Sequence, residues 1–147
     1  MSLRIPELAL PLLTAPHCVV IATNMPDGTP HQSIVWHLWE DPHILISSYG
    51  ATQKVKNLRR DPRVSITVFA PHDPYNYVVV RGVVQSIEPE LDDLASEEAF
   101  VNRVSRHYTG KKYYGSEGEE VHALVKDAMP NTLVITIQPT KISYVKG

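Results

Sequence analysis

A basic stretch near the middle of the chain carries the residue types best suited to binding an anion. The segment ATQKVKNLRRDPRVSITV, residues 51–68, holds five cations beside one acid, Asp61. The cations are Lys54, Lys56, Arg59, Arg60 and Arg63. The whole chain of 147 residues has a formal net charge of −2, so this clustering is local. It indicates either a solvated helix face, which charge runs often form, or a site for a negatively charged ligand.

The position of the lysines within the expected helix favours the ligand site. Val55 and Leu58 lie on one helical face, and Pro62 ends the helix because it disfavours a helical residue before it. Lys54 and Lys56 then stand near the helix start, where the macrodipole makes each cation unfavourable by roughly 0.3–1 kcal/mol. The N–H groups of the first turn have no partner within the helix, so they are also available to an anion. A phosphate arriving there would turn repulsion into attraction.

Two segments before the basic stretch are expected to form a wall beside this anion site. In HQSIVWHLWE, residues 31–40, neither alternate face is plainly polar, so both faces are expected to be covered. Ser47 and Ser48 end an apolar strand just before the basic helix, where they offer hydroxyls and backbone donors to a planar polar ligand. The alternative is that the two serines cap a strand end and face water.

Short β-branched segments joined by tight turns make up most of the remaining chain. Asp27-Gly28 is a hairpin signal, and Gly82 within a long strand predicts a bulge or bend. Strands are expected at 18–23, 31–40, 43–49, 63–70, 77–89 and 131–145, the last with a break at Pro139. Helices are expected at Pro6–Leu13, in the basic stretch, at Asp92–Tyr108 and at Ser116–Ala128. This order predicts one domain over residues 1–147, mainly β with flanking helices, whose strands close into a small antiparallel barrel.

Several function classes lack their motif in this chain. There is no glycine-rich dinucleotide fingerprint, no P-loop and no G-x-S-x-G nucleophile motif. The slightly negative net charge argues against a nucleic-acid binder. No apolar run approaches the ~20 residues of a membrane span, so no membrane partner is expected.

The histidines and the cysteine predict neither a metal site nor a disulfide. None of the seven histidines has the spacing of a helical zinc pair. His31, His37 and His43 could meet across strands, but their spacing does not demand it. Cys18 lies in the apolar run CVVIAT and is expected to be a buried small hydrophobe. With one thiol and no export signal at its N-terminus, the protein is expected to be cytoplasmic.

The segment from Ser33 to Val68 resembles a known family. The strands SIVWHLWED and ILISSY, followed by the basic stretch, are similar to the flavin-binding split barrel of the pyridoxamine-phosphate-oxidase superfamily. The pattern K-x-(K/R)-N-L-R-R-D-P-R-V is typical of its branch that uses the deazaflavin coenzyme F-420. The resemblance implies an antiparallel six-stranded split β-barrel. It also implies a homodimer with two cofactor sites at the subunit interface.

The resemblance further implies cofactor contacts by position. The residues implied to line the ring and its side chain are Ser33, Val35, Trp36, Ser47 and Ser48. The residues implied to hold the phosphate region are Thr52, Gln53, Lys54 and Asn57. The residues implied to attract the acidic tail of F-420 are Lys56, Arg59 and Arg60. Tyr77 is expected to come from the partner subunit.

Departures from the FMN-using oxidases favour F-420 over FMN as the cofactor. Those enzymes tend to carry arginine where this chain has Ser33 and Gln53, and the missing cations weaken the case for tight FMN phosphate binding. The ending ISYVKG also lacks the tryptophan and arginine of the pyridoxamine-phosphate oxidases. Pyridoxamine phosphate is therefore not expected to be the substrate.

The resemblance implies an oxidoreductase that transfers hydride from reduced F-420 to a small unsaturated organic substrate. In such enzymes the cofactor performs the hydride transfer. His37 and Tyr77 are candidate proton donors, but both are expected to pack or bind, so no catalytic residue is assigned. An FMN-dependent enzyme of the same fold and a non-catalytic cofactor- or haem-binding protein are the alternatives. The loop HYTGKKYYGSEG, residues 107–118, suits either a lid or a plain connector.

Overall fold

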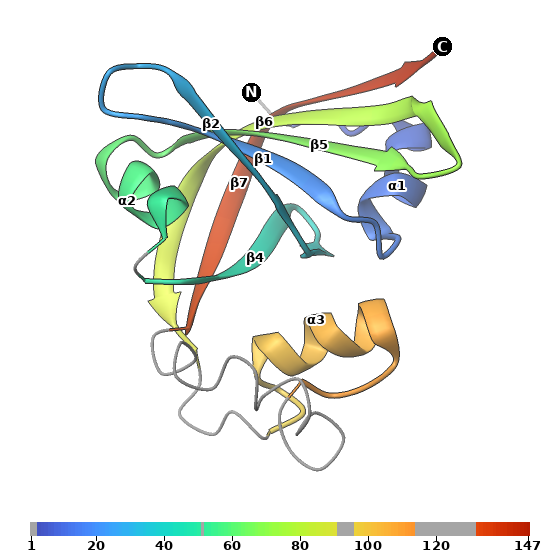
Figure 1. Cartoon of the computed structure of the whole chain (residues 1–147). Coiled ribbons are helices and arrows are strands. Elements are labelled where there is room, and N and C mark those ends of the chain that lie inside the picture. The colour runs from blue at the N-terminus through green and yellow to red at the C-terminus, as the bar shows by residue number, and fades with distance from the viewer. Residues whose placement is uncertain (1–2, 51, 91–95, 114–131) are drawn as a thin grey trace.

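The computed structural model describes residues 3–50, 52–90, 96–113 and 132–147 (Figure 1). The strands are β1 (Val19–Asn24), β2 (Pro30–Val35), β3 (His37–Glu40), β4 (His43–Tyr49), β5 (Arg63–Ala70), β6 (Asp73–Pro89) and β7 (Thr132–Lys146). The helices are the 3-10 turn η1 (Glu7–Ala9), α1 (Leu10–Thr14), α2 (Gln53–Arg60) and α3 (Phe100–Thr109). All of the strand pairs are antiparallel, so the predicted fold class, mainly β with flanking helices, is confirmed.

The strands form one sheet that closes on itself. Its order is β2-β1-β5-β6-β7-β4-β3, so β2 and β3 are the two edges. These edge strands follow each other in the sequence with only Trp36 between them. The sheet must therefore curl until its edges meet at this residue, which produces the barrel seen in Figure 1.

The sheet has seven strands where six were expected, because the segment 31–40 divides at Trp36. Val35 pairs with Val19 of β1, whereas His37 pairs with Ile46 of β4. One unbroken strand cannot lie at both edges of the sheet. The backbone turns at Trp36 and passes from one edge to the other.

Gly82 produces the bulge predicted for the long strand β6. The register between β6 and β7 shifts between Arg81 and Gly82. A Cβ atom at Gly82 would lie 2.6 Å from the backbone oxygen of Gln138, so only glycine fits this close approach. The break expected at Pro139 is wrong, because β7 continues through it. Pro139 lies opposite Gly82, where the ladder is already irregular and a missing N–H is tolerated.

Alternate apolar side chains fill the barrel interior. In β1 the buried positions are Val19, Ile21 and Thr23. Cys18 was expected to be buried, but it is exposed. The alternation of β1 places the position before Val19 on the opposite side, which is the physical reason for this difference.

Helices cover the barrel as their apolar spacing predicts. The expected N-terminal helix forms as η1 and α1, which bury Ala9, Leu12 and Leu13 in the main core. On α2 the face predicted from Val55 and Leu58 is buried in the same core.

Of the helix expected at Asp92–Tyr108, residues 92–95 lie outside the described residues, residues 96–99 are not helical, and α3 spans Phe100–Thr109. The carboxylate of Glu90 accepts hydrogen bonds from the backbone N–H groups of Phe100 (3.1 Å) and Val101 (3.0 Å). This carboxylate caps α3 and stabilises its positive end. The helix expected at 116–128 lies outside the described residues, as do residues 114–118 of the loop considered as a lid.

Candidate functional site

A pocket of about 400 Å³ lies between the barrel and α3, a size typical of small-molecule sites. Its polar wall consists of Ser47, Ser48, Thr52, Lys54 and Thr132. Its apolar wall consists of Ile34, Val35, Trp36, Val101 and Val104, and Tyr113 completes the lining. The two walls suit a ligand with a charged group at one end and a flat, largely apolar part at the other.

Lys54 is the charged group of the polar wall. Its side chain is only 9% exposed, and it makes no hydrogen bond or ion pair with any residue that the structure describes. Burial lowers the pKa of its ammonium group. A buried cation without a counter-ion is unfavourable. An anion bound in the pocket would remove this penalty.

The start of α2 adds hydrogen-bond donors to the same end of the pocket. The Thr52 hydroxyl caps the helix by accepting from the N–H of Val55 at 3.4 Å, and it lies 3.1 Å from Ser48 Oγ. First-turn N–H groups have no partner within a helix, and the helix dipole adds positive potential. Lys54, the helix start and the hydroxyls of Ser48 and Thr52 therefore make a suitable site for phosphate.

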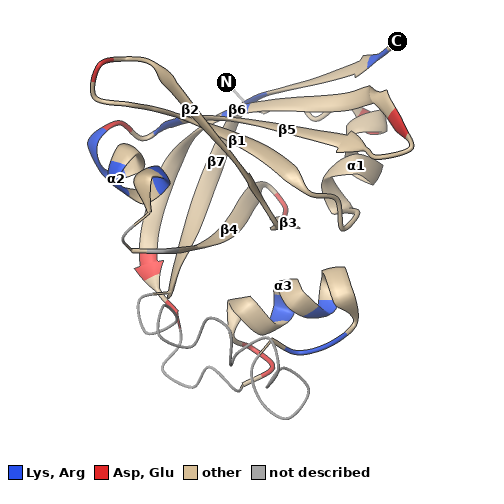
Figure 2. Cartoon of the chain, in the orientation of Figure 1, with Lys and Arg blue, Asp and Glu red and all other residues tan. Residues whose placement is uncertain are grey.

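Five predicted phosphate or tail residues on α2 lie outside the pocket lining: Gln53, Lys56, Asn57, Arg59 and Arg60. Asn57 is fully buried, its Nδ2 donates to Thr23 Oγ1 at 3.1 Å, and its Oδ1 accepts from Gln53 Nε2 at 2.9 Å. These two amides thereby connect α2 to β1 and to each other. Lys56 is exposed, because two positions along a helix turn it roughly 200° away from Lys54. Figure 2 shows how far the basic residues spread along α2.

Ser33 and Tyr77 also lie outside the pocket lining. Ser33 stands on β2 two residues before Val35, on the same face of the strand, and its Oγ is buried without a hydrogen-bond partner among the described residues. Its predicted contact with the cofactor stays a prediction. Tyr77 lies on β6, the middle strand of the sheet order, where it pairs with Phe69 of β5 and Val145 of β7. Its predicted contact across a dimer stays a prediction.

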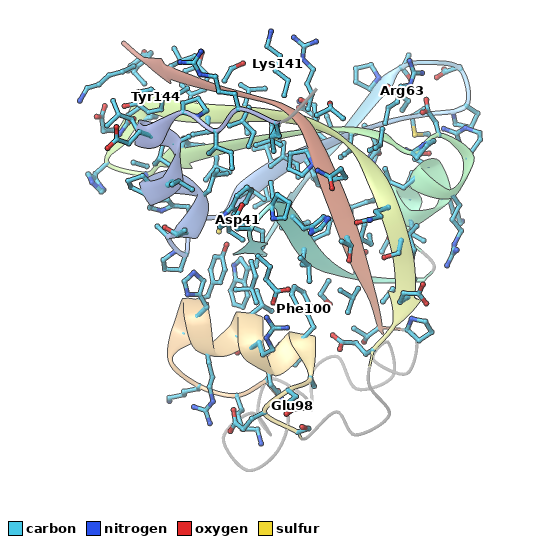
Figure 3. All side chains as sticks on the ribbon, turned by 180° about the vertical axis from the view of Figure 1, so that it is seen from behind. Asp41, Arg63, Glu98, Phe100, Lys141 and Tyr144 are labelled. Carbon is cyan, nitrogen blue, oxygen red and sulfur yellow. The ribbon has the colours of Figure 1, made fainter. Side chains whose placement is uncertain are left out.

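The sequence did not single out the wall that α3 contributes. Val101 and Val104 line the pocket, and Val104 also packs in a buried cluster with Leu45 and with Phe100, which Figure 3 labels. An apolar helix face ordinarily indicates a core contact. Nothing in the spacing of this face shows which of its apolar side chains also line a pocket.

His37 is not available to the pocket as a proton donor. Its side chain is 1% exposed, its Nε2 lies 2.7 Å from the backbone oxygen of Leu13, and its Nδ1 lies 3.0 Å from the Tyr108 hydroxyl. Burial lowers the pKa of the ring. His37 therefore has a structural position between the N-terminal segment and α3.

Of the residues that line the pocket, Lys54 and Tyr113 have titratable side chains. Within the described ranges, no group of three or more His, Cys, Asp and Glu residues could hold a metal ion. No helix in these ranges is long and apolar enough to cross a membrane.

Comparison with known proteins identifies the family. Residues 5–146 match the family model described as pyridoxamine 5'-phosphate oxidase. The chain belongs to the pyridoxamine 5'-phosphate oxidase family. The resemblance found in Ser33–Val68 is thereby confirmed, and the match extends over nearly the whole chain.

Solved structures of family-like proteins have the same fold. A structure described as an F-420 reductase is 27% identical, covers 95% of this chain and 98% of its own, and superposes with a TM-score of 0.77. A conserved hypothetical protein from Mycobacterium tuberculosis is 25% identical, with 99% and 90% coverage and a TM-score of 0.71. General Stress Protein 26 from Bacillus anthracis, at 21% identity, shares the fold over 95% and 92% of the two chains with a TM-score of 0.65.

Proposed function

We propose that this family member is a cytoplasmic oxidoreductase that uses reduced coenzyme F-420 to deliver hydride to a small unsaturated organic substrate. The observation that carries the proposal is the Lys54 side chain, which is 9% exposed, has no counter-ion among the described residues and lines a pocket with one apolar wall. This arrangement suits a cofactor that combines a phosphate with a flat ring. The similarity to an F-420 reductase supports the choice of cofactor.

The pocket residues divide between the two parts of such a cofactor. Lys54, Thr52 and Ser48 would hold the phosphate at the start of α2. Val35, Trp36 and Ser47 would face the ring and the chain that joins it to the phosphate. Gln53 and Asn57 would support this site from behind, through the hydrogen bonds that anchor α2.

The cofactor, when bound, supplies the hydride chemistry. The contribution of the chain is to bind, to orient and to exclude water. Lys54 neutralises the charged end of the cofactor, while Trp36, Val101 and Val104 form an apolar surface against its flat part. Because this apolar surface excludes water, it strengthens the electrostatic contacts at the polar end of the pocket.

We also propose that the active form is a homodimer. Ile34 lies on the edge strand β2, lines the pocket and is 71% exposed. A large apolar side chain left exposed beside a ligand pocket is a suitable contact for a second copy of the chain. Analytical ultracentrifugation should give twice the mass of the chain, and Ile34→Glu should shift the protein toward the monomer.

Binding titrations distinguish F-420 from FMN. The purified chain is titrated with each cofactor while tryptophan fluorescence is followed, because Trp36 lies in the pocket wall. We expect F-420 to bind at least about tenfold more tightly, a difference of about 1.4 kcal/mol. Tighter binding of FMN would assign the chain to the FMN-dependent enzymes of the fold.

Turnover distinguishes an enzyme from a carrier. Reduced F-420 is mixed with the protein and with a panel of quinones, enones and tetrapyrroles, and its oxidation is followed by absorbance. Consumption of the reduced cofactor with at least one acceptor is expected. Tight binding without consumption across the panel would indicate a protein that binds the cofactor but does not catalyse its oxidation.

A further inference from the structure

Trp36 lines the pocket but does not pair with any strand of the sheet. It lies between β2 and β3 and has no partner in the strand ladders, whereas Val35 and His37 on either side are both paired. Its side chain is 37% exposed and lines the pocket. The plane of the indole must therefore be set by a contact outside the sheet.

Tyr108 of α3 supplies that contact. The two rings are stacked, with centroids 4.7 Å apart and an angle of 11° between their planes. Such offset aromatic pairs have a preferred geometry and contribute beyond their buried area. The indole thus has the pocket on one side and the tyrosine ring on another.

Hydrogen bonds hold Tyr108 itself in place. Its hydroxyl accepts from the backbone N–H of His37 at 3.1 Å and donates to the backbone oxygen of His17. The same hydroxyl lies 3.0 Å from Nδ1 of His37. Three segments far apart in the sequence therefore meet at one hydroxyl: α3, the start of β3 and the segment before β1.

The protonation states of Tyr108 and His37 keep these hydrogen bonds in place near neutral pH. Burial raises the pKa of Tyr108 to about 12, so the hydroxyl keeps its proton. Burial also lowers the pKa of His37, and its Nε2 must carry the proton that is donated to the oxygen of Leu13 at 2.7 Å. The neutral imidazole then presents Nδ1 as an acceptor, so Nδ1 and the backbone oxygen of His17 share or compete for the single proton of the Tyr108 hydroxyl.

We propose that Tyr108 is a positioning residue that sets the plane of the Trp36 indole in the pocket wall and thereby determines affinity for the flat part of a ligand. The proposal rests on the proposed function, because it takes the ligand to be a phosphate-bearing molecule with a planar ring. It assigns Tyr108 no contact with the reacting atoms. It predicts that the polar end of the pocket, at Lys54, is independent of Tyr108.

Binding of three probes to two variants tests the proposal. F-420, FMN and inorganic phosphate are titrated into wild type, Tyr108→Leu and Tyr108→Phe, with Tyr75→Leu as the control because Tyr75 is 73% exposed and outside the pocket lining. Whichever of F-420 and FMN binds wild type should bind Tyr108→Leu with an affinity about 3- to 10-fold lower, because one aromatic pair is lost. Phosphate affinity should stay within about twofold in every variant, since Lys54 is unchanged.

The conservative variant separates positioning from stability. Tyr108→Phe keeps the stacked ring, so it should retain affinity for the ring-bearing probe within about threefold. It removes the hydroxyl and should lower Tm, because the buried N–H of His37 loses its acceptor. Equal losses for phosphate and for the ring-bearing probes in Tyr108→Leu, or no loss for either, would overturn the proposal.

A readout in the ligand-free protein keeps this test separate from the proposed function. Trp36 and Trp39 are the two tryptophans of the chain, so Trp39→Phe leaves Trp36 as the single reporter. Adding Tyr108→Leu to this background should raise quenching of Trp36 by iodide about twofold or more, whereas Tyr75→Leu should not. If wild type binds none of the probes, the proposed function fails. The quenching result then decides the positioning role, and unchanged quenching would overturn it.

Discussion

The two ends of α2 carry the same kind of charge in opposite physical situations. At its start Lys54 is buried and has no counter-ion among the described residues. Beyond its end Arg63 is exposed and pairs with Asp61 at 2.8 Å, and Arg60 donates to the backbone oxygen of Asn24. The comparison shows that the number of cations in a segment does not locate a binding site. Under the proposed function, the site is instead at the buried cation that has no counter-ion among the described residues.

The cations at the two ends of α2 also differ in how they affect the stability of the fold. An exposed, paired arginine is screened by water and contributes little. A buried lysine without a partner opposes folding until a ligand arrives. We therefore expect substitutions at the two ends to differ in sign as well as in size.

The largest expected effect is on ligand affinity. Lys54→Ala should weaken binding of the F-420 phosphate by about 10- to 100-fold, because a buried charged contact is lost. Lys56→Ala is the matched control, since Lys56 is an exposed lysine of the same helix outside the pocket lining. It should change affinity by about twofold or less. Isothermal titration calorimetry measures both, and equal losses would show that the two lysines contribute in the same way.

A smaller effect is expected on the ligand-free protein. Lys54→Met should raise the free energy of unfolding by about 1 kcal/mol, because it removes an uncompensated buried charge and keeps an unbranched side chain. Arg59→Met, at an exposed position of the same helix, should stay within about 0.5 kcal/mol of wild type. Urea unfolding gives both values. A loss of stability in Lys54→Met would mean that the ammonium group already has a stabilising partner.

The burial of Lys54 should also affect how the free energy of unfolding depends on pH. The pKa of Lys54 is lowered from its ordinary value of 10.5, so the unfolded chain binds more protons than the folded chain in the alkaline range below that value. Stability therefore gains a contribution as pH rises toward 10.5, and this contribution is lost as pH falls through the folded pKa. Unfolding curves at several alkaline pH values should show this gain in wild type and in Lys56→Met. An equal gain in Lys54→Met would assign it to other groups.

The smallest effect is expected at the far end of α2. The pKa of Asp61 is lowered well below its usual range, first by the side chain of Arg63 and then by that of Asn24. Its contribution is present above the ordinary aspartate pKa and is lost as pH falls toward the folded value. Asp61→Asn should therefore flatten the acid part of the stability curve slightly and leave affinity for F-420 unchanged. A change in affinity would extend the binding site to this end of the helix.

Much of the barrel was predictable because its signals are local. Runs of β-branched residues predicted the strands other than the division between β2 and β3, Pro62 predicted the end of α2, and Gly82 predicted the bulge. Each depends on a few neighbouring residues. The division of 31–40 into two strands was not predictable, because it arises when Val35 and His37 pair with different partners at opposite edges of the sheet.

The candidate site was predictable only in part. Six of the predicted cofactor residues line the pocket: Val35, Trp36, Ser47, Ser48, Thr52 and Lys54. Their roles stay predictions. The cap of α3 by Glu90 joins residues ten positions apart in the chain, and no local pattern indicates such a bond. Nor does spacing separate Lys54 from Lys56, since both stand near the start of the helix.

The sequence by itself determined the strands, the basic helix and the presence of cations at its start, because hydrophobic alternation, capping and proline effects act over a few residues. Tertiary structure alone decided which lysine is buried and which ring supports Trp36. Both depend on how α2 is rotated against β1 and where α3 packs on the barrel. Those are contacts between segments that the chain brings together only on folding.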